Sequence, residues 1–142
     1  MQYTALFERE VKRTTIEFPD CPGCATFAEP DEDAVATAKE ALEGWLEAHL
    51  IEGEAAPRPT FSGPVTRRAK AVRIAVDPAL AARLQIRWAR DDAGLSQAEL
   101  AKRMGVPRQQ VSRIESSDGN LTMATIDRVA KALGVPWSVQ IG

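Results

Sequence analysis

Apolar and polar positions alternate near the start of the chain in the manner of short β-strands. The segments YTALFERE, RTTIEF and CATFAE combine this alternation with β-branched and aromatic residues. Such runs are typical of strands that bury one face. We therefore expect a hairpin followed by a third short strand.

A helical period replaces the alternation over PDEDAVATAKEALEGWLEAHLIE, residues 30–52. Apolar residues at three- and four-residue spacing predict an amphipathic helix. They are Val35, Ala38, Leu42, Leu46 and Leu50. The acidic residues Asp31, Glu32 and Asp33 are expected in its first turn, where the helix dipole favours negative charge.

The second half of the chain is dominated by helical patterns. Residues 52–68 are rich in proline and glycine and are expected to form a linker. The segment KAVRIAV that follows predicts a strand at about 70–76. Helix start and stop signals then predict four helices. Their expected ranges are 78–93, 96–104, 107–116 and 122–133. The final VPWSVQIG alternates again and predicts a short C-terminal strand.

These elements predict two domains with different partners. An α+β module is expected at residues 1–77, and an all-α domain with the C-terminal strand at 78–142. Residues 1–66 carry 5 Lys/Arg against 13 Asp/Glu, a net charge of −8, whereas residues 67–142 carry 13 against 7, a net charge of +6. An acidic surface suits a basic partner, and a basic surface suits the phosphate backbone of nucleic acid.

The chain contains neither a long apolar run nor the charged-then-apolar order of a signal peptide. We expect a cytoplasmic protein of a bacterium or an archaeon that does not associate with a membrane.

The stretch GLSQAELAKRMGVPRQQVSRIES has the pattern of two helices joined by a sharp turn. Ser96 and Glu99 form a capping-box pattern, Gly105 permits the turn, and Pro107 restarts the helix. The apolar seam between the helices is expected to comprise Leu100, Met104, Val111 and Ile114. The outward-facing side chains are then Arg108, Gln109, Gln110, Ser112 and Arg113.

Arginine and glutamine are the side chains that read guanine and adenine in the major groove, so this pattern predicts DNA binding. The alternative is a plain helical hairpin with a solvated polar face.

Residues 79–134 resemble a Cro/C1-type helix-turn-helix domain. The resemblance implies that Gln97 contacts a DNA phosphate and that Arg108, Gln109, Gln110 and Arg113 face the bases. The loop SSDGN departs from the basic loop common in that family, and Asp118 would repel a phosphate. Asn120 is left as the loop residue expected to contact DNA.

The N-terminal half resembles the HicB-type antitoxins. The matching residues are Phe18, Pro19, Asp20, Pro22, Gly23, Cys24, Thr26, Ala34, Ala38, Glu40, Ala41, Leu42, Trp45 and Leu46. The resemblance implies a truncated ribonuclease-H-like β-β-β-α-β fold that binds and blocks a small basic toxin ribonuclease of the HicA type. It also implies that a C-terminal DNA-binding domain represses the operon of the protein.

Cys21 and Cys24 form a Cys-x-x-Cys pair, which raises the possibility of redox or metal chemistry. A redox pair usually opens a helix, and a zinc site needs about four ligands, whereas His49 is the one histidine of the chain. We therefore expect a structural role for the pair, no metal ion and no cofactor. No catalytic constellation is recognisable, so we do not expect an enzyme.

Two other functions remain open from the residues alone. The chain could be a stand-alone Cro/C1-type repressor whose N-terminal module senses a ligand or partner. It could also be an active nuclease, although the ribonuclease-H carboxylates are absent from recognisable positions.

The C-terminal segment is the predicted dimerisation element. Every odd position from 135 onward is apolar: Val135, Trp137, Val139 and Ile141. A strand needs a neighbouring strand, and a two-fold mate would supply one while holding two DNA-reading units about one turn of DNA apart. We expect a homodimer that could assemble further into a tetramer. The alternative is that the tail folds back on its own helices.

Overall fold

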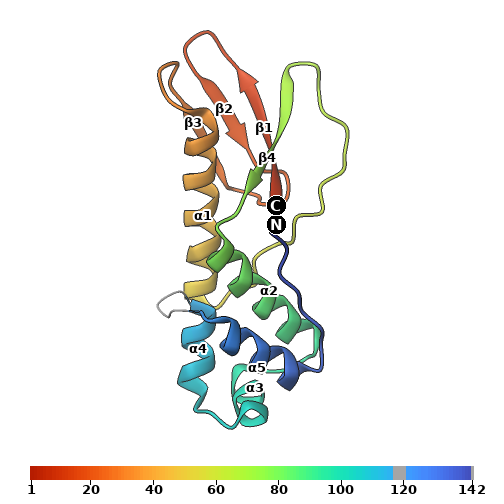
Figure 1. Ribbon diagram of the computed structural model, residues 1–142. Helices are drawn as coiled ribbons and strands as arrows, with labels where there is room; N and C mark the ends of the chain where they lie inside the picture. Colours follow the sequence, from red (N-terminus) through yellow and green to blue (C-terminus); the bar gives the residue numbers. More distant parts are fainter. Residues whose placement is uncertain (117–120, 142) are drawn as a thin grey trace. The chain divides into compact units, whose positions relative to one another are not determined.

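The computed structural model describes residues 1–116 and 121–141. The chain divides into two compact units. Residues 1–49 and 56–78 form the N-terminal unit, and residues 50–55 join the residues from 79 onward in the C-terminal unit. Figure 1 shows the elements of both units along the chain.

The N-terminal unit is built on a four-stranded antiparallel sheet. Its elements in chain order are β1 (Gln2–Arg9), β2 (Thr14–Glu17), β3 (Ala25–Ala28), α1 (Ala34–Glu52) and β4 (Ala69–Ala75). The strand order is β3-β2-β1-β4, so the last strand closes the sheet beside the first. The expected β-β-β-α-β order is confirmed, while the likeness to ribonuclease H stays a prediction.

Strand alternation decides which side chains enter the core of the N-terminal unit. Tyr3, Ala5, Ile16 and Ile74 are buried on one face of the sheet. Helix α1 lies along this side of the sheet in Figure 1 and buries Ala38, Leu42 and Leu46. Val35, which the helical period placed on the same stripe, is 48% exposed. The buried stripe therefore begins one turn later than its periodicity predicts.

The acidic residues before α1 cap the helix instead of lying in its first turn. The helix begins at Ala34, after the acidic run. The Asp33 carboxylate accepts hydrogen bonds from the backbone N–H groups of Val35 (3.0 Å) and Ala36 (3.2 Å). These N–H groups have no partner within the helix, so a side-chain acceptor is favourable just before it.

The proline-rich segment between α1 and β4 is tied to the N-terminal unit. Tyr3 donates from its hydroxyl to the Pro57 carbonyl at 2.6 Å. The Asp20 carboxylate accepts from the backbone N–H groups of Thr60 and Phe61, both at 3.0 Å, and from the Thr60 hydroxyl at 3.1 Å. Residues 56–68 of the expected linker are thus part of this unit, whereas residues 52–55 belong to the C-terminal unit.

The C-terminal unit is a cluster of helices. They are α2 (Pro78–Asp92), α3 (Gln97–Met104), α4 (Arg108–Ser116) and α5 (Met123–Leu133). Their core comprises Ile86, Leu100, Ala101, Val111, Val129 and Leu133. The bounds agree with the predicted ranges to within one residue, because caps such as Ser96 and Gly134 are local signals.

Residues 135–141 lie outside any strand in the chain as described. A strand is defined by hydrogen bonds to a neighbouring backbone, and the sheet of the N-terminal unit contains only β1 to β4. The expected C-terminal strand is therefore not formed within a single chain.

No helix among the described residues is long and apolar enough to cross a membrane.

Candidate DNA-binding surface

Local signals shape the corner between α3 and α4. Ser96 accepts a hydrogen bond from the Glu99 N–H at 3.1 Å, and the Glu99 carboxylate accepts from the Ser96 N–H at 3.2 Å. Hydrogen bonds from the Ser96 backbone N–H and the Ser96 side chain hold the pKa of the Glu99 carboxyl below its usual value. Gly105 ends α3 with a φ of 69°, a left-handed conformation that strains other residues. The chain can therefore turn at once into α4.

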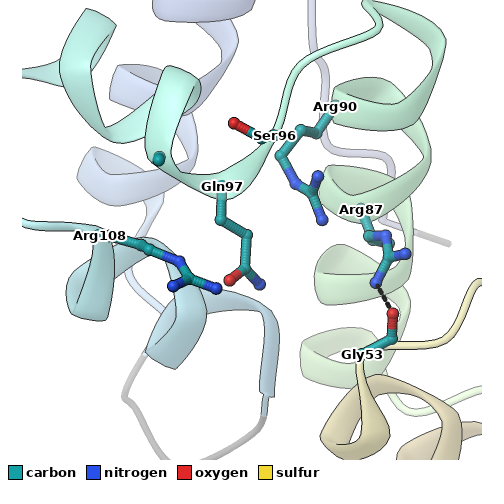
Figure 2. A pocket seen from close by; sticks show the side chains of 7 residues that line it. Gly53, Arg87, Arg90, Ser96, Gln97 and Arg108 are labelled. Atoms are coloured by element: carbon teal, nitrogen blue, oxygen red, sulfur yellow. Dashed lines mark hydrogen bonds between the residues drawn. The ribbon is translucent and has the colours of Figure 1, made fainter.

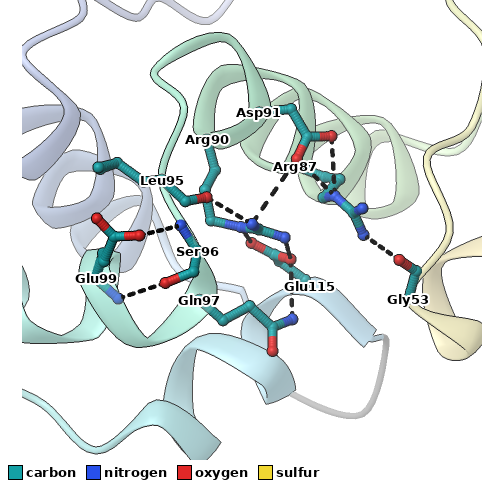
Figure 3. Close-up of polar contacts among 9 residues, drawn as sticks. All are labelled: Gly53, Arg87, Arg90, Asp91, Leu95, Ser96, Gln97, Glu99 and Glu115. Atoms are coloured by element: carbon teal, nitrogen blue, oxygen red, sulfur yellow. Dashed lines mark hydrogen bonds and ion pairs between the residues drawn. The ribbon is translucent and has the colours of Figure 1, made fainter.

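A buried ion pair lies beneath this corner. Arg90 of α2 donates to Glu115 of α4 through Nε at 2.7 Å and Nη2 at 2.8 Å, as Figure 3 shows. Nη1 of the same guanidinium donates to the Leu95 carbonyl at 2.8 Å. The Glu115 side chain is only 2% exposed. The hydrogen bonds to Glu115 raise the pKa of Arg90, so the guanidinium keeps its charge.

This pair positions Gln97, the predicted phosphate contact. Gln97 opens α3, and its amide Nε2 donates to Glu115 at 3.2 Å. The amide carries a second N–H, which is free to donate to a ligand. Glu115 thereby orients a side chain on a different helix.

Gln97 lines an open pocket in the C-terminal unit, shown in Figure 2. The pocket residues are Gly53, Arg87, Arg90, Ser96, Gln97, Ala98 and Arg108. Arg87 is bound to Asp91 at 3.0 Å and donates to the Gly53 carbonyl at 2.9 Å. Arg108 forms no ion pair with any of the described residues, so its charge is available beside Gln97.

The five predicted groove-facing side chains of α4 differ in their exposure. Arg108, Gln109 and Arg113 are exposed, whereas Gln110 and Ser112 are partly buried. Val111 points into the core, so the opposite side of the helix is polar. Asn120, the predicted loop contact, lies outside the described residues.

The arrangement can contact DNA in two ways. Exposed arginine and glutamine side chains on one helix face can donate to base edges in the major groove, which admits an α-helix. Gln97 and the N-terminus of α3 offer N–H groups that suit a backbone phosphate. No cofactor or metal ion is needed for either contact.

The four predicted dimerisation residues keep large exposed surfaces. The exposed fractions are 40% for Val135, 37% for Trp137, 54% for Val139 and 94% for Ile141. The Trp137 indole N–H donates to the Asp127 carboxylate of α5 at 3.1 Å. The tail is thus held to its own helix at one point while its apolar side chains face solvent.

The cysteine pair lies in the turn between β2 and β3 of the N-terminal unit. Both thiols are free and buried. Burial raises the pKa of Cys21 to about 12 and that of Cys24 to about 11. Because the thiolate is the reactive form, these values favour inert, protonated thiols at neutral pH.

Reasoning from the sequence missed the Arg90–Glu115 pair and the role of Asp20 in holding the segment after α1. One signal was available for Glu115, which follows Val111 by four residues and so shares its apolar side of α4. A carboxylate at such a position indicates a buried partner.

Comparisons with known proteins agree with this arrangement. The family described as "HicB_like antitoxin of bacterial toxin-antitoxin system" matches residues 3–80, and the family described as "Helix-turn-helix" matches residues 86–140. Antitoxin HicB 1 of Photorhabdus laumondii subsp. laumondii is 34% identical over 126 residues, which are 89% of this chain and 77% of that protein.

A second protein of the same organism, Antitoxin HicB 2, is 27% identical over 134 residues, which are 94% of this chain and 91% of that protein. Among solved structures, a chain of a "HicA3 and HicB3 toxin-antitoxin complex" matches with a TM-score of 0.43 and 23% identity, covering 55% of this chain and all of that one. The N-terminal family match covers more than half of the chain, and Antitoxin HicB 1 is similar over most of both lengths. This chain belongs to the family of HicB-like antitoxins of bacterial toxin–antitoxin systems and carries a helix-turn-helix domain.

Proposed function

We propose that this chain neutralises a small, basic toxin ribonuclease of the HicA type and represses transcription of its own operon. The observation that carries the proposal is the combination of a HicB-like antitoxin match and a helix-turn-helix match on one chain. The acidic N-terminal sequence suits a basic toxin, and the exposed polar face of α4 suits operator DNA.

The repressor would use two kinds of contact. Arg108, Gln109, Gln110, Ser112 and Arg113 are proposed to meet the DNA from the recognition helix, while Gln97 holds a phosphate. Asn120 is proposed as a further backbone contact. Dimerisation through Val135, Trp137, Val139 and Ile141 would place two such helices on a palindromic operator.

A reading frame for a small basic protein is expected beside the one for this chain, and co-expression of the two products tests the antitoxin role. We expect growth arrest by the toxin alone, recovery when this chain is present, and loss of RNA cleavage by the purified toxin when the two are mixed. An Arg113→Ala variant is the matched control, because it should lose operator selectivity and still protect cells. Continued growth arrest with well-folded, abundant wild-type protein would refute the proposal.

A further inference from the structure

The sheet of the N-terminal unit has one face that α1 leaves uncovered. Tyr3 and Ala5 point toward the core, so the alternate residues of β1 point to the other side. The residues that pair with these positions on the neighbouring strands point to the same side, so this second face runs over all four strands. We call it the open face, and it comprises Gln2, Thr4, Leu6, Glu8, Thr15, Glu17, Ala25, Phe27, Ala69, Ala71, Arg73 and Ala75.

Half of the twelve side chains of the open face are small. Four of its positions are alanine and two are threonine, and both β4 and β3 expose alanines to solvent. Leu6 and Phe27 are its two large apolar side chains, and Phe27 is 46% exposed. Small side chains lose little conformational entropy when a partner binds, so another protein can approach these positions closely.

Two carboxylates lie on the two inner strands of this surface. Leu6 is paired with Glu17 across β1 and β2, and Glu8 is paired with Thr15, so the two glutamates occupy diagonal positions. Such positions lie roughly 7–8 Å apart, within reach of long side chains. Neither glutamate forms an ion pair with a residue in the described part of the chain. Their mutual repulsion does not help the sheet to fold, and one cation placed between them would be attracted by both.

The cations near the open face do not neutralise these glutamates. Arg73 of β4 pairs with Thr4, whereas Ala69 is the β4 residue that pairs with Glu8, and β4 does not pair with β2, which carries Glu17. Arg13 lies over the Phe27 ring, 4.8 Å from its centroid, and approaches Glu10 at 3.6 Å. The charge that complements Glu8 and Glu17 is therefore left for another molecule to supply.

We propose that the open face is the surface on which the basic toxin docks, with Glu8 and Glu17 receiving a lysine or arginine side chain and Leu6 and Phe27 making the apolar contact. The proposal rests on the proposed antitoxin function and names the surface that performs it. Steering by the two carboxylates would make association fall as salt rises.

Calorimetric titration of the full-length chain with the purified co-encoded toxin tests the docking surface. Glu17→Arg should weaken binding at least about tenfold, because it replaces attraction with repulsion on an inner strand of the face. Glu40→Arg makes the same change of charge at an exposed position of α1, on the other side of the sheet, and should change the affinity less than about twofold. Urea unfolding of both variants shows that each is folded.

The possible results separate the docking surface from the function itself. If wild-type protein binds the toxin and both Glu8→Arg and Glu17→Arg bind equally well, the open face is not the docking surface and the antitoxin function stands. If folded wild-type protein does not bind the toxin, the proposed function fails. If Glu17→Arg alters the mass of the isolated antitoxin and leaves toxin affinity unchanged, the open face joins copies of this chain, which overturns the proposal.

Discussion

Glu115 is a charged residue whose main neighbour is another buried charge, Arg90. Replacing Glu115 with alanine would remove both short hydrogen bonds between the buried guanidinium and a carboxylate, leaving Arg90 the Leu95 carbonyl and a longer contact of 3.8 Å to Asp91. Loss of one member of a buried ion pair typically costs about 3–5 kcal/mol of unfolding free energy. We predict a loss of this size for Glu115→Ala, measured by urea denaturation followed by circular dichroism.

Glu99→Ala is the matched control, because it removes an exposed carboxylate from the same helix pair. Loss of its capping bond should cost about 1 kcal/mol or less. Equal losses for the two variants would contradict the role assigned to the buried pair. Replacement of both Arg90 and Glu115 by apolar residues should recover much of the stability, since no unpaired charge then remains.

The two buried cysteines are expected to make the free energy of unfolding decrease at alkaline pH. The folded pKa values of Cys21 and Cys24 lie above the ordinary thiol value near 9.0, so folding favours the protonated forms. The stability that this contributes is fully present below that ordinary value. It is lost as pH rises from about 9 toward the folded values, because the unfolded thiols then release protons that the folded thiols keep.

We predict that unfolding free energy falls more steeply from about pH 7 to about pH 10 in the wild-type chain than in a Cys21→Ala/Cys24→Ala variant. Urea titrations at both pH values measure the difference. Parallel declines would show that the thiols do not titrate as their burial implies.

At the scale of elements, the proposed DNA contacts are divided between α3 and α4. A good bidentate base contact contributes about 1–3 kcal/mol of discrimination, and a phosphate contact contributes to all sequences alike. We predict that Arg113→Ala reduces operator preference at one or two base pairs of each half-site. Gln97→Ala should weaken binding to operator and unrelated DNA by similar factors, measured by titration at one fixed salt concentration.

Arg108→Ala provides the second recognition-helix variant, from the end of α4 that lies beside Gln97. If Arg108→Ala and Arg113→Ala both keep full operator selectivity, α4 does not read the bases. Loss of selectivity in Gln97→Ala would mean that α3 contributes more than a backbone contact.

At the scale of the whole molecule, the exposed C-terminal tail sets the expected assembly. Truncation after Gly134 removes four exposed apolar side chains, and we predict that it converts a dimer to a monomer and lowers operator affinity. The reason is that two recognition helices must be held about 34 Å apart to read a palindrome. Light scattering and operator titration measure the two effects.

Toxin binding should survive this truncation, because the proposed docking surface lies on the N-terminal sheet. A full-length Asp127→Ala variant is the control, since it removes the contact of Trp137 with its own helix and keeps the tail. A truncated chain that retains both the dimer mass and the operator affinity would place the interface elsewhere.

Much of the fold could be predicted from short-range patterns. The helix bounds around the turn agree with prediction because Ser96, Glu99 and Gly105 act within one turn of their own positions. The four strands of the N-terminal unit agree because side chains alternate with a period of two, whereas the strand expected at the C-terminus is not formed, because no neighbouring backbone among the described residues pairs with it. The periodic pattern did not show that Val35 is exposed, since it cannot tell how far along α1 the sheet extends.

What the sequence by itself determined is therefore the order and type of the elements, the charge difference between the two halves, and the polar set on α4. Only the tertiary structure decided that Arg90 meets Glu115, 25 residues away, and that Asp20 holds Thr60, 40 residues away. It also decided that Glu8 and Glu17 share an uncovered face, through the register of β1 and β2. Caps and periods act over a few neighbouring residues, whereas these contacts depend on how whole elements pack, which no local pattern specifies.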